Sequence, residues 1–184
     1  MQLTTKRFVL RDFEDDDLPD FEAYHADPRS RELYGPGENT PEHALELVQL
    51  FKAWAAEEPR QNYQFAVVRL DGQLVGCAGL RMKDAEPGRA ELGVELAPTY
   101  WGQFGYAVEI MKCLVEYGFN NFDLVEIFGS TVSENSKVAR LANAFGAVSM
   151  ERNTPAWMVA KGWRQIEWQI SRWDWFARPS NKRL

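Results

Sequence analysis

The segment that most constrains this chain runs from Ala90 to Ala107 and reads AELGVELAPTYWGQFGYA. Every second residue from Leu92 to Leu96 is apolar, which is the period of a half-buried strand. Pro98 ends that pattern, and beyond Gly105 the apolar residues recur every three or four positions, as in an amphipathic helix. The segment therefore predicts a strand, a glycine-containing loop and a helix that begins between Gln103 and Gly105.

A loop of this kind suits an anionic ligand. Glycine lets the backbone turn several N–H groups toward one point, and the first N–H groups of a helix have no acceptor within the helix. A pyrophosphate fits such a site. The glycines do not follow the GxGxxG spacing of a Rossmann fold, and no Gly-Lys-Ser or Gly-Lys-Thr of a Walker loop occurs.

Composition predicts one globular domain. The chain has 184 residues, of which 45% are hydrophobic and 26% charged, and we assign residues 1–177 to the domain and 178–184 to a disordered tail. No apolar run approaches the roughly 18 residues that span a bilayer, and the N-terminus begins a strand pattern and not a signal peptide. We therefore expect a cytoplasmic protein without a membrane partner.

The net charge and the cysteine positions argue against a nucleic-acid-binding or metal-binding protein. The net charge of −6 argues against a nucleic-acid partner and is compatible with a cationic acceptor. Cys77 and Cys113 lack metal-ligand spacing and lie in apolar patterns, so they are expected to be reduced, buried thiols. No metal site is predicted.

Strand and helix patterns alternate along the chain. Further strands are expected at Thr5–Phe13, Tyr63–Leu70, Gln73–Met82, Leu124–Thr131, Ala147–Arg152 and Trp163–Ser171. Further helices are expected from Asp15 to Ala26, from Pro41 through Trp54, and from Asn135 to Phe145, with Gly146 as the last helix's cap. Asp71-Gly72 predicts a tight hairpin. Together these elements predict an α+β fold with a mixed, mostly antiparallel sheet.

Two sets of conspicuous side chains are interpreted as structural. Trp168, Trp173 and Trp175 show alternate spacing around the last strand, so we expect core and edge packing there and not a cofactor site. His25 and His43 lie on the two early helices and are expected at the surface.

Three parts of the chain carry a family resemblance. The loop is similar to the signature Gln or Arg, two residues, Gly, one residue, Gly or Ala: Gly105 and Ala107 match, Gly102 takes the first position, and Gln103 follows it. The segments TKRFVLRDFEDDDLPDFEAYHADP and TVSENSKVARLANAFGA resemble a first strand and helix and a later strand and Asn-led helix. All three resemble the GNAT acetyltransferase superfamily, in particular its ribosomal-protein N-terminal acetyltransferases.

This resemblance implies a single GNAT-like domain whose central strands splay apart around the pantetheine arm of acetyl-CoA. The backbone between Val94 and Leu96 would bond the pantetheine amides, and the loop would hold the pyrophosphate. The residues so assigned to acetyl-CoA are Val94, Leu96, Gly102, Gln103, Phe104, Gly105, Tyr106, Ala107 and Asn135.

The catalytic groups are less clearly marked. Acetyl transfer needs a neutral amine near the thioester, an oxyanion donor and a proton for the thiolate, without a metal. Val138 and Ala142 stand where related enzymes carry a serine or a tyrosine acid. Glu91 and Glu95, on one face of the predicted strand, are the candidate catalytic residues, and solvent-side carboxylates are the alternative for both.

Two serine hydroxyls and two loops are further candidates for the active site. Ser130 and Ser136 are possible proton donors, and capping or strand hydroxyls are the alternative interpretation. The loops Leu33–Glu38 and Thr154–Gly162 would shape the acceptor pocket but carry no recognisable chemistry.

We therefore expect an acetyl-CoA-dependent N-acetyltransferase that acts directly on a primary amine of a peptide N-terminus or a small molecule, and a homodimer is compatible with the sequence. An aminoglycoside or polyamine acetyltransferase, or a CoA-binding sensor without catalysis, is the alternative.

Overall fold

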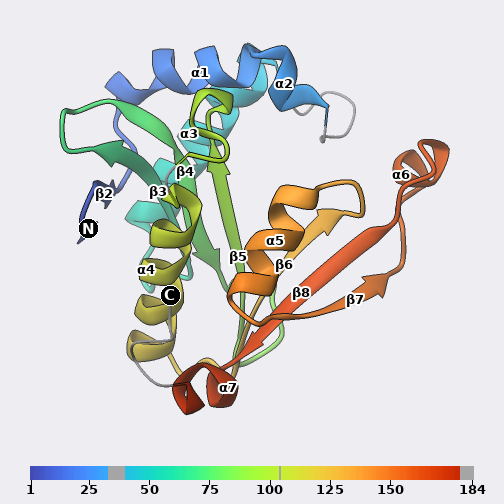
Figure 1. The fold of residues 1–184 in the computed structure, drawn as a ribbon. Coiled ribbons are helices and arrows are strands. Elements are labelled where there is room, and N and C mark those ends of the chain that lie inside the picture. The colour runs from blue at the N-terminus through green and yellow to red at the C-terminus, as the bar shows by residue number, and fades with distance from the viewer. Residues whose placement is uncertain (33–39, 104, 179–184) are drawn as a thin grey trace.

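The computed structural model describes residues 1–32, 40–103 and 105–178. One eight-stranded sheet runs through the molecule in the order β1-β2-β3-β4-β5-β6-β8-β7, with helices on both of its faces (Figure 1). Neighbouring strands are antiparallel except β5 and β6, which are parallel. The strands are β1 Gln2–Thr4, β2 Phe8–Arg11, β3 Asn62–Arg69, β4 Leu74–Arg81, β5 Arg89–Leu96, β6 Glu126–Val132, β7 Val148–Arg152 and β8 Gln165–Ser171.

The helices follow capping and proline signals in the sequence. Thr40 accepts a hydrogen bond from the His43 N–H, and Pro41 occupies the first turn, where its missing N–H costs nothing. The helices are η1 Asp15–Asp17, α1 Leu18–Ala26, α2 Pro28–Arg31, α3 Pro41–Ala56, η2 Pro98–Tyr100, α4 Tyr106–Asn121, α5 Ser136–Ala144, α6 Ala156–Ala160 and α7 Arg172–Ala177. In the parts described, no helix is long and apolar enough to cross a membrane.

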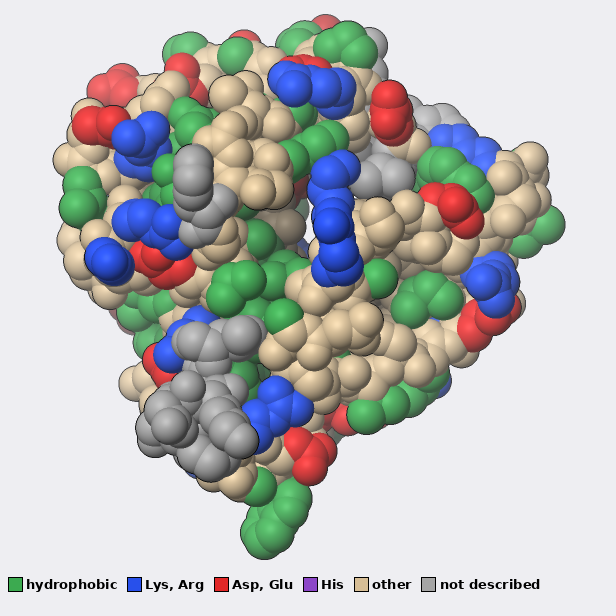
Figure 2. Space-filling view, viewed as in Figure 1, with side chains coloured by type: hydrophobic (Ala, Val, Ile, Leu, Met, Phe, Trp, Pro, Cys, Tyr) green, Lys and Arg blue, Asp and Glu red, His purple; other side chains and the backbone are tan. Residues whose placement is uncertain are grey.

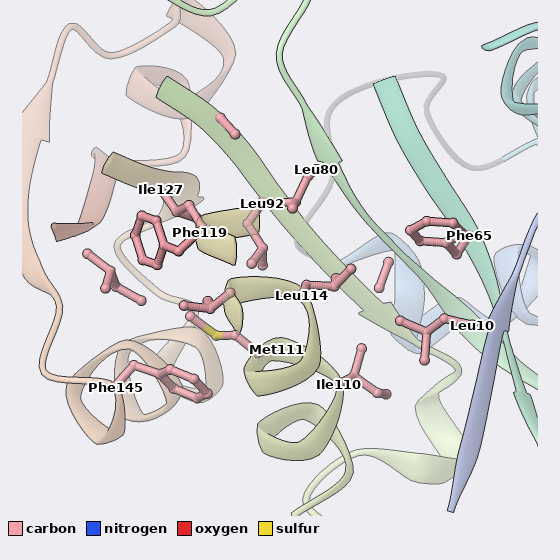
Figure 3. Close-up of a cluster of buried hydrophobic side chains, with 14 of the residues drawn as sticks. Leu10, Phe65, Leu80, Leu92, Ile110, Met111, Leu114, Phe119, Ile127 and Phe145 are labelled. Carbon is pink, nitrogen blue, oxygen red and sulfur yellow. The ribbon is translucent and has the colours of Figure 1, made fainter. Parts of the chain in front are cut away.

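Successive side chains of each strand point to opposite faces of the sheet, so the hydrophobic core consists of two layers. On one face, Leu92 of β5 packs with Ile110, Met111 and Leu114 of α4, as the labelled side chains show (Figure 3). On the other face, α1 and α3 cover the sheet with an aromatic cluster that includes Phe21. The predicted α+β architecture and its mostly antiparallel sheet are confirmed, and β5 stands at its centre with a helix layer on each side.

The strand expected from Thr5 to Phe13 is confirmed only in part: β2 occupies Phe8–Arg11, and the chain turns between Thr5 and Phe8. Thr5 and Phe8 exchange backbone and hydroxyl hydrogen bonds of 2.8–3.2 Å, which separate β1 from β2. Thr5 Oγ1 and the Arg7 N–H also donate to Glu109 of α4, at 2.7 and 2.8 Å. These long-range bonds fix a turn that the alternating sequence does not reveal.

The C-terminal tryptophans are only partly as expected. Trp168 of β8 is buried over Gly129, where an added Cβ would lie 2.2 Å from the indole ring. Trp173 and Trp175 are not on the strand, because the Ser171 side chain accepts from the Asp174 N–H and starts α7. Trp175 stacks on Phe145 and is 1% exposed, whereas Trp173 is 82% exposed.

The end of α5 is as predicted. Gly146 adopts a φ of +60°, and the N–H groups of Gly146 and Ala147 bond back to Asn143 and Ala142. Arg178, the first residue of the expected tail, donates to the Gly146 carbonyl at 3.3 Å. Residues 179–184 lie outside the described part of the chain.

Candidate active site

The two parallel central strands pair over a short length only. Their register covers Arg89–Glu91 of β5 and Glu126–Phe128 of β6. Arg89 clamps this end, since its guanidinium donates to Glu126 at 2.6 Å and to Glu167 of β8 at 3.2 Å. Beyond it the strands separate, and the surface is hollowed between β5 and α5, with Lys and Arg side chains at the rim (Figure 2).

The open part of β5 directs backbone groups into the split. The Ala97 N–H donates to the Val75 carbonyl at 2.8 Å, and Glu95 pairs with Cys77. In an antiparallel ladder, the alternate residues Val94 and Leu96 then direct their N–H and C=O groups away from β4. The Leu96 carbonyl accepts from the Trp101 indole at 2.7 Å, which ties the loop to the end of the strand.

The glycine loop lies at the mouth of this split. Gly102 and Gly105 have φ angles of +71° and +68°, and Gly105 is the N-cap of α4, so the helix starts where the sequence predicts. The Tyr106 N–H donates to the Gln103 carbonyl at 3.1 Å, and the Gln103 side chain donates to the Thr99 carbonyl at 2.8 Å. Gln103 therefore braces the loop. Ala107 follows in the first turn, while Phe104 lies outside the described residues.

Two cations that the sequence does not single out lie beside the loop. The Arg7 guanidinium is 4.7 Å from the Tyr106 ring centroid and donates to Glu109 at 2.6 Å. The Lys137 ammonium is 4.2 Å from the Trp101 ring centroid. Burial alone would raise the pKa of Glu109, but hydrogen bonds from Thr5 and Arg7 outweigh it and lower that pKa. Arg7 is far from the loop in sequence, so only the fold reveals its position.

Asn135 caps the helix that borders the other side of the split. Its side-chain oxygen accepts from the Val138 N–H at 3.2 Å, which makes Asn135 the N-cap of α5. Ala142 is buried in the hydrophobic core, and the partly buried Val138 packs against this core cluster. Ser130 and Ser136 are exposed, and the cap of α5 is Asn135 and not Ser136.

Glu91 and Glu95 project to the face of the sheet that α1 and α3 cover, and each has a cationic or titratable partner. The Arg81 guanidinium contacts Glu91 at 3.1 Å and also donates to Gln64 at 3.3 Å. The Glu95 carboxylate lies 3.3 Å from Nε2 of His25. The two carboxylates are 34% and 27% exposed, so neither is a simple solvent-side group.

The expectation that His25 lies at the surface is wrong. The ring is 3% exposed because it packs between the side chains of Phe21 and Tyr24, whose centroids are 4.3 and 4.5 Å away. His43 is partly exposed on α3. The apolar pattern of α1 does not predict this burial, because a histidine is compatible with either a buried or an exposed position of the helix.

The cysteines do not suit nucleophilic catalysis. Burial, followed by the charge of Glu95, raises the pKa of Cys77 to about 12. Burial also raises the pKa of Cys113 to about 11, although this thiol is only partly buried, contrary to the expectation of two buried thiols. Both cysteines are free, and both thiols stay protonated near neutral pH.

A cleft opens beside Glu91 on this face. Its empty volume is about 480 Å³, and Trp54, Arg81, Asp84, Glu91 and Phe128 are among its lining residues. It therefore combines two carboxylates, one guanidinium and two aromatic rings next to β5. The expected acceptor loop 33–38 lies outside the described residues, and the second expected loop contains α6.

Comparison with known proteins agrees with this architecture. An uncharacterized N-acetyltransferase from Bacillus licheniformis is 29% identical over 143 residues, which are 77% of this chain and 79% of the relative. A ribosomal-protein alanine acetyltransferase from Vibrio fischeri has a TM-score of 0.70 at 19% identity, covering 97% of this chain and 100% of that one. A spermidine N-acetyltransferase chimera from Vibrio cholerae and hSSAT has a TM-score of 0.75 at 19% identity, covering 93% and 99%.

The family profile settles the classification. The acetyltransferase (GNAT) domain matches residues 7–148, a range that includes the split between β5 and β6, the glycine loop and the capped helix α5. Enzymes of this family use acetyl-CoA as the acetyl donor. The chain therefore belongs to the GNAT acetyltransferase family and is an acyltransferase.

Proposed function

We propose that this enzyme binds acetyl-CoA in the split between β5 and β6 and transfers the acetyl group directly to a primary amine. The observation that carries the proposal is the short parallel pairing, which leaves the backbone of Val94 and Leu96 facing an open recess. Amide groups of a pantetheine arm could continue the ladder there, as an added strand does.

The loop supports the same orientation of the donor. The first turn of α4 offers N–H groups without intrahelical acceptors, and Gly102 has open space where a side chain would stand. A pyrophosphate at this point would carry two negative charges close to Arg7 and Lys137. In this proposal Tyr106, Ala107 and Asn135 line the donor site.

The acceptor is assigned to the opposite face, in the cleft beside Glu91. Asp84 and Glu91 would attract an ammonium group, whereas Arg81 in the same cleft would repel a polycation and suits a carbonyl oxygen. A peptide N-terminus has an amine and a carbonyl close together, so it fits this mixed lining better than a polyamine does. We also expect a cytoplasmic enzyme, and homodimerisation is compatible with the proposal.

A panel of amines tests the proposal. Purified protein would be incubated with acetyl-CoA and short peptides of different N-termini, spermidine or an aminoglycoside, and acetylated products measured by mass spectrometry. We expect acetylation at the α-amine of peptides and little or none of the polyamine. Thermal stabilisation by acetyl-CoA without acetylation of any amine would instead favour the CoA-binding sensor.

A further inference from the structure

A second cleft opens at the end of the sheet, next to the glycine loop. Its empty volume is about 550 Å³, and it lies between the turn before β2, the β3–β4 hairpin and the first residue of α4. Strand pairing brings the turn and the hairpin together, since Phe8 lies opposite Arg69 in the register of β2 and β3. Three of the side chains that line the cleft are cationic, and these are Lys6, Arg7 and Arg69.

Arg7 connects this cleft to the glycine loop. Its backbone N–H and its Nε donate to the carboxylate of Glu109 at 2.8 and 2.6 Å, so the residue is fixed beside the first turns of α4. Its guanidinium carbon is 4.7 Å from the Tyr106 ring centroid, and its Nη2 is 4.0 Å from the point where a Cβ of Gly105 would stand. An anion in the cleft and an anion on the loop would therefore both lie close to this guanidinium.

The other two cations are accessible to a ligand. Lys6 is exposed, and no carboxylate in the described part of the chain forms an ion pair with it. Arg69 is 39% exposed and pairs with Asp71, itself 56% exposed, at 3.2 Å. Water screens an ion pair of this kind, so the pair contributes little to stability and Arg69 can exchange Asp71 for a ligand at little cost.

The charge around the cleft is opposite to that of the molecule. Lys6, Arg7 and Arg69 outnumber the two carboxylates beside them, Asp71 and Glu109, whereas the whole chain has a net charge of −6. Lys and Arg side chains lie over the region of β2, at the left of the space-filling view (Figure 2). A locally positive cleft on an acidic protein favours an anionic ligand.

We propose that this cleft is a second anion site, which binds a phosphate monoester carried on a nucleoside. Lys6 and Arg69 donate charge-assisted hydrogen bonds to the phosphate. Leu70, which is 67% exposed, and the Tyr106 ring provide apolar surface for the base. Two sources share this chemistry: the 3′-phosphoadenosine end of acetyl-CoA bound as proposed above, and a free nucleotide. The first source rests on the proposed function.

Titration calorimetry at low ionic strength separates the two sources. CoA, dephospho-CoA and adenosine 3′-monophosphate are titrated into the wild type and into the Lys6→Gln, Arg69→Gln double variant. If CoA supplies the phosphate, the wild type binds CoA at least about tenfold more tightly than dephospho-CoA, and the double variant binds both as weakly as the wild type binds dephospho-CoA. If a free nucleotide supplies it, CoA and dephospho-CoA bind equally, and adenosine 3′-monophosphate binds to the CoA-saturated wild type but not to the double variant.

Two further variants test the charge assignment. Asp71→Asn keeps an oxygen acceptor in the hairpin turn but removes the carboxylate that competes for Arg69, so it should bind the phosphate about threefold or more tightly than the wild type. Arg164→Gln is the matched control, since Arg164 is an exposed arginine paired with Glu151 at 3.1 Å, at the opposite edge of the sheet. It should bind every ligand as the wild type does.

A wild type that binds CoA and dephospho-CoA equally and binds no nucleotide beside CoA would overturn the inference. The same holds for a folded double variant that keeps the wild-type preference. If neither CoA nor dephospho-CoA binds, the proposed function is refuted, and adenosine 3′-monophosphate with the free protein decides the cleft. Binding that the double variant loses would then support the site, and its absence would reject it.

Discussion

At the scale of single residues, Glu91 and Glu95 lie on the face where we propose that the acceptor binds. Arg81 contacts Glu91 beside the cleft, so in this proposal Glu91 binds the ammonium, and Glu95 lies 3.3 Å from Nε2 of His25. Glu91→Gln should therefore lower kcat/KM for the amine by about ten- to a thousandfold and leave acetyl-CoA affinity unchanged.

Steady-state kinetics at several pH values and acetyl-CoA titration calorimetry measure both effects. Lys83→Gln, which alters an exposed ion pair with Glu57 on the same side of the sheet, is the control and should act like the wild type. A Glu91→Gln enzyme with full activity would remove Glu91 from the acceptor site and leave Glu95 as the remaining carboxylate of the two that the sequence predicted.

The sequence predicted these two carboxylates but not their partners. Alternation in β5 is enough to place Glu91 and Glu95 on one face, because side-chain direction in a strand has a strict period of two. His25 meets Glu95 only through the packing of α1 on the sheet, some 70 positions along the chain, and no local pattern encodes that contact. The error over His25 has the same origin.

At the scale of elements, the loop and α4 form one unit whose geometry depends on two left-handed glycines. Gly105→Val would strain a φ of +68° with a β-branched side chain at the point where the helix N–H groups converge. Acetyl-CoA should then raise the melting temperature of the wild type but not of Gly105→Val.

Gly162→Val is the matched control, since Gly162 has a φ of +71°, has no atom within 4 Å of an added Cβ, and lies in the turn after α6. It should lose comparable stability yet retain the stabilisation by acetyl-CoA. Similar shifts for all three proteins would mean that the pyrophosphate is not held at this loop.

Elements were predictable where local signals are strong. The hairpin at Asp71-Gly72, the start of α4 and the end of α5 all follow glycine positions, and the structure has them there. The turn at Thr5–Arg7 and helix α7 were missed because hydroxyl hydrogen bonds determine them, in one case with a partner on α4. The split between β5 and β6 came from the family resemblance, since no single strand encodes the register of its neighbour.

At the scale of the whole molecule, β5 lies between the proposed donor site and the proposed acceptor site. Its backbone faces the split that is proposed for the donor, while Glu91 and Glu95 face the layer of α1 and α3, where the acceptor is proposed. Donor and acceptor can therefore be bound together without sharing space. The sheet brings the two proposed sites together although their residues come from distant parts of the sequence.

The order of the kinetic steps tests this arrangement. Because the pKa values of Cys77 and Cys113 are raised to about 12 and about 11, neither thiol is ionised near neutral pH, and an acyl-cysteine route lacks its nucleophile. Acetyl should pass straight to the amine, so initial-rate lines at several fixed amine concentrations should intersect. The Cys77→Ser, Cys113→Ser double variant should keep its activity per folded molecule, with any loss confined to thermal stability because Cys77 is buried. Parallel lines, or an acetylated enzyme trapped in the absence of amine, would show that transfer proceeds through the protein.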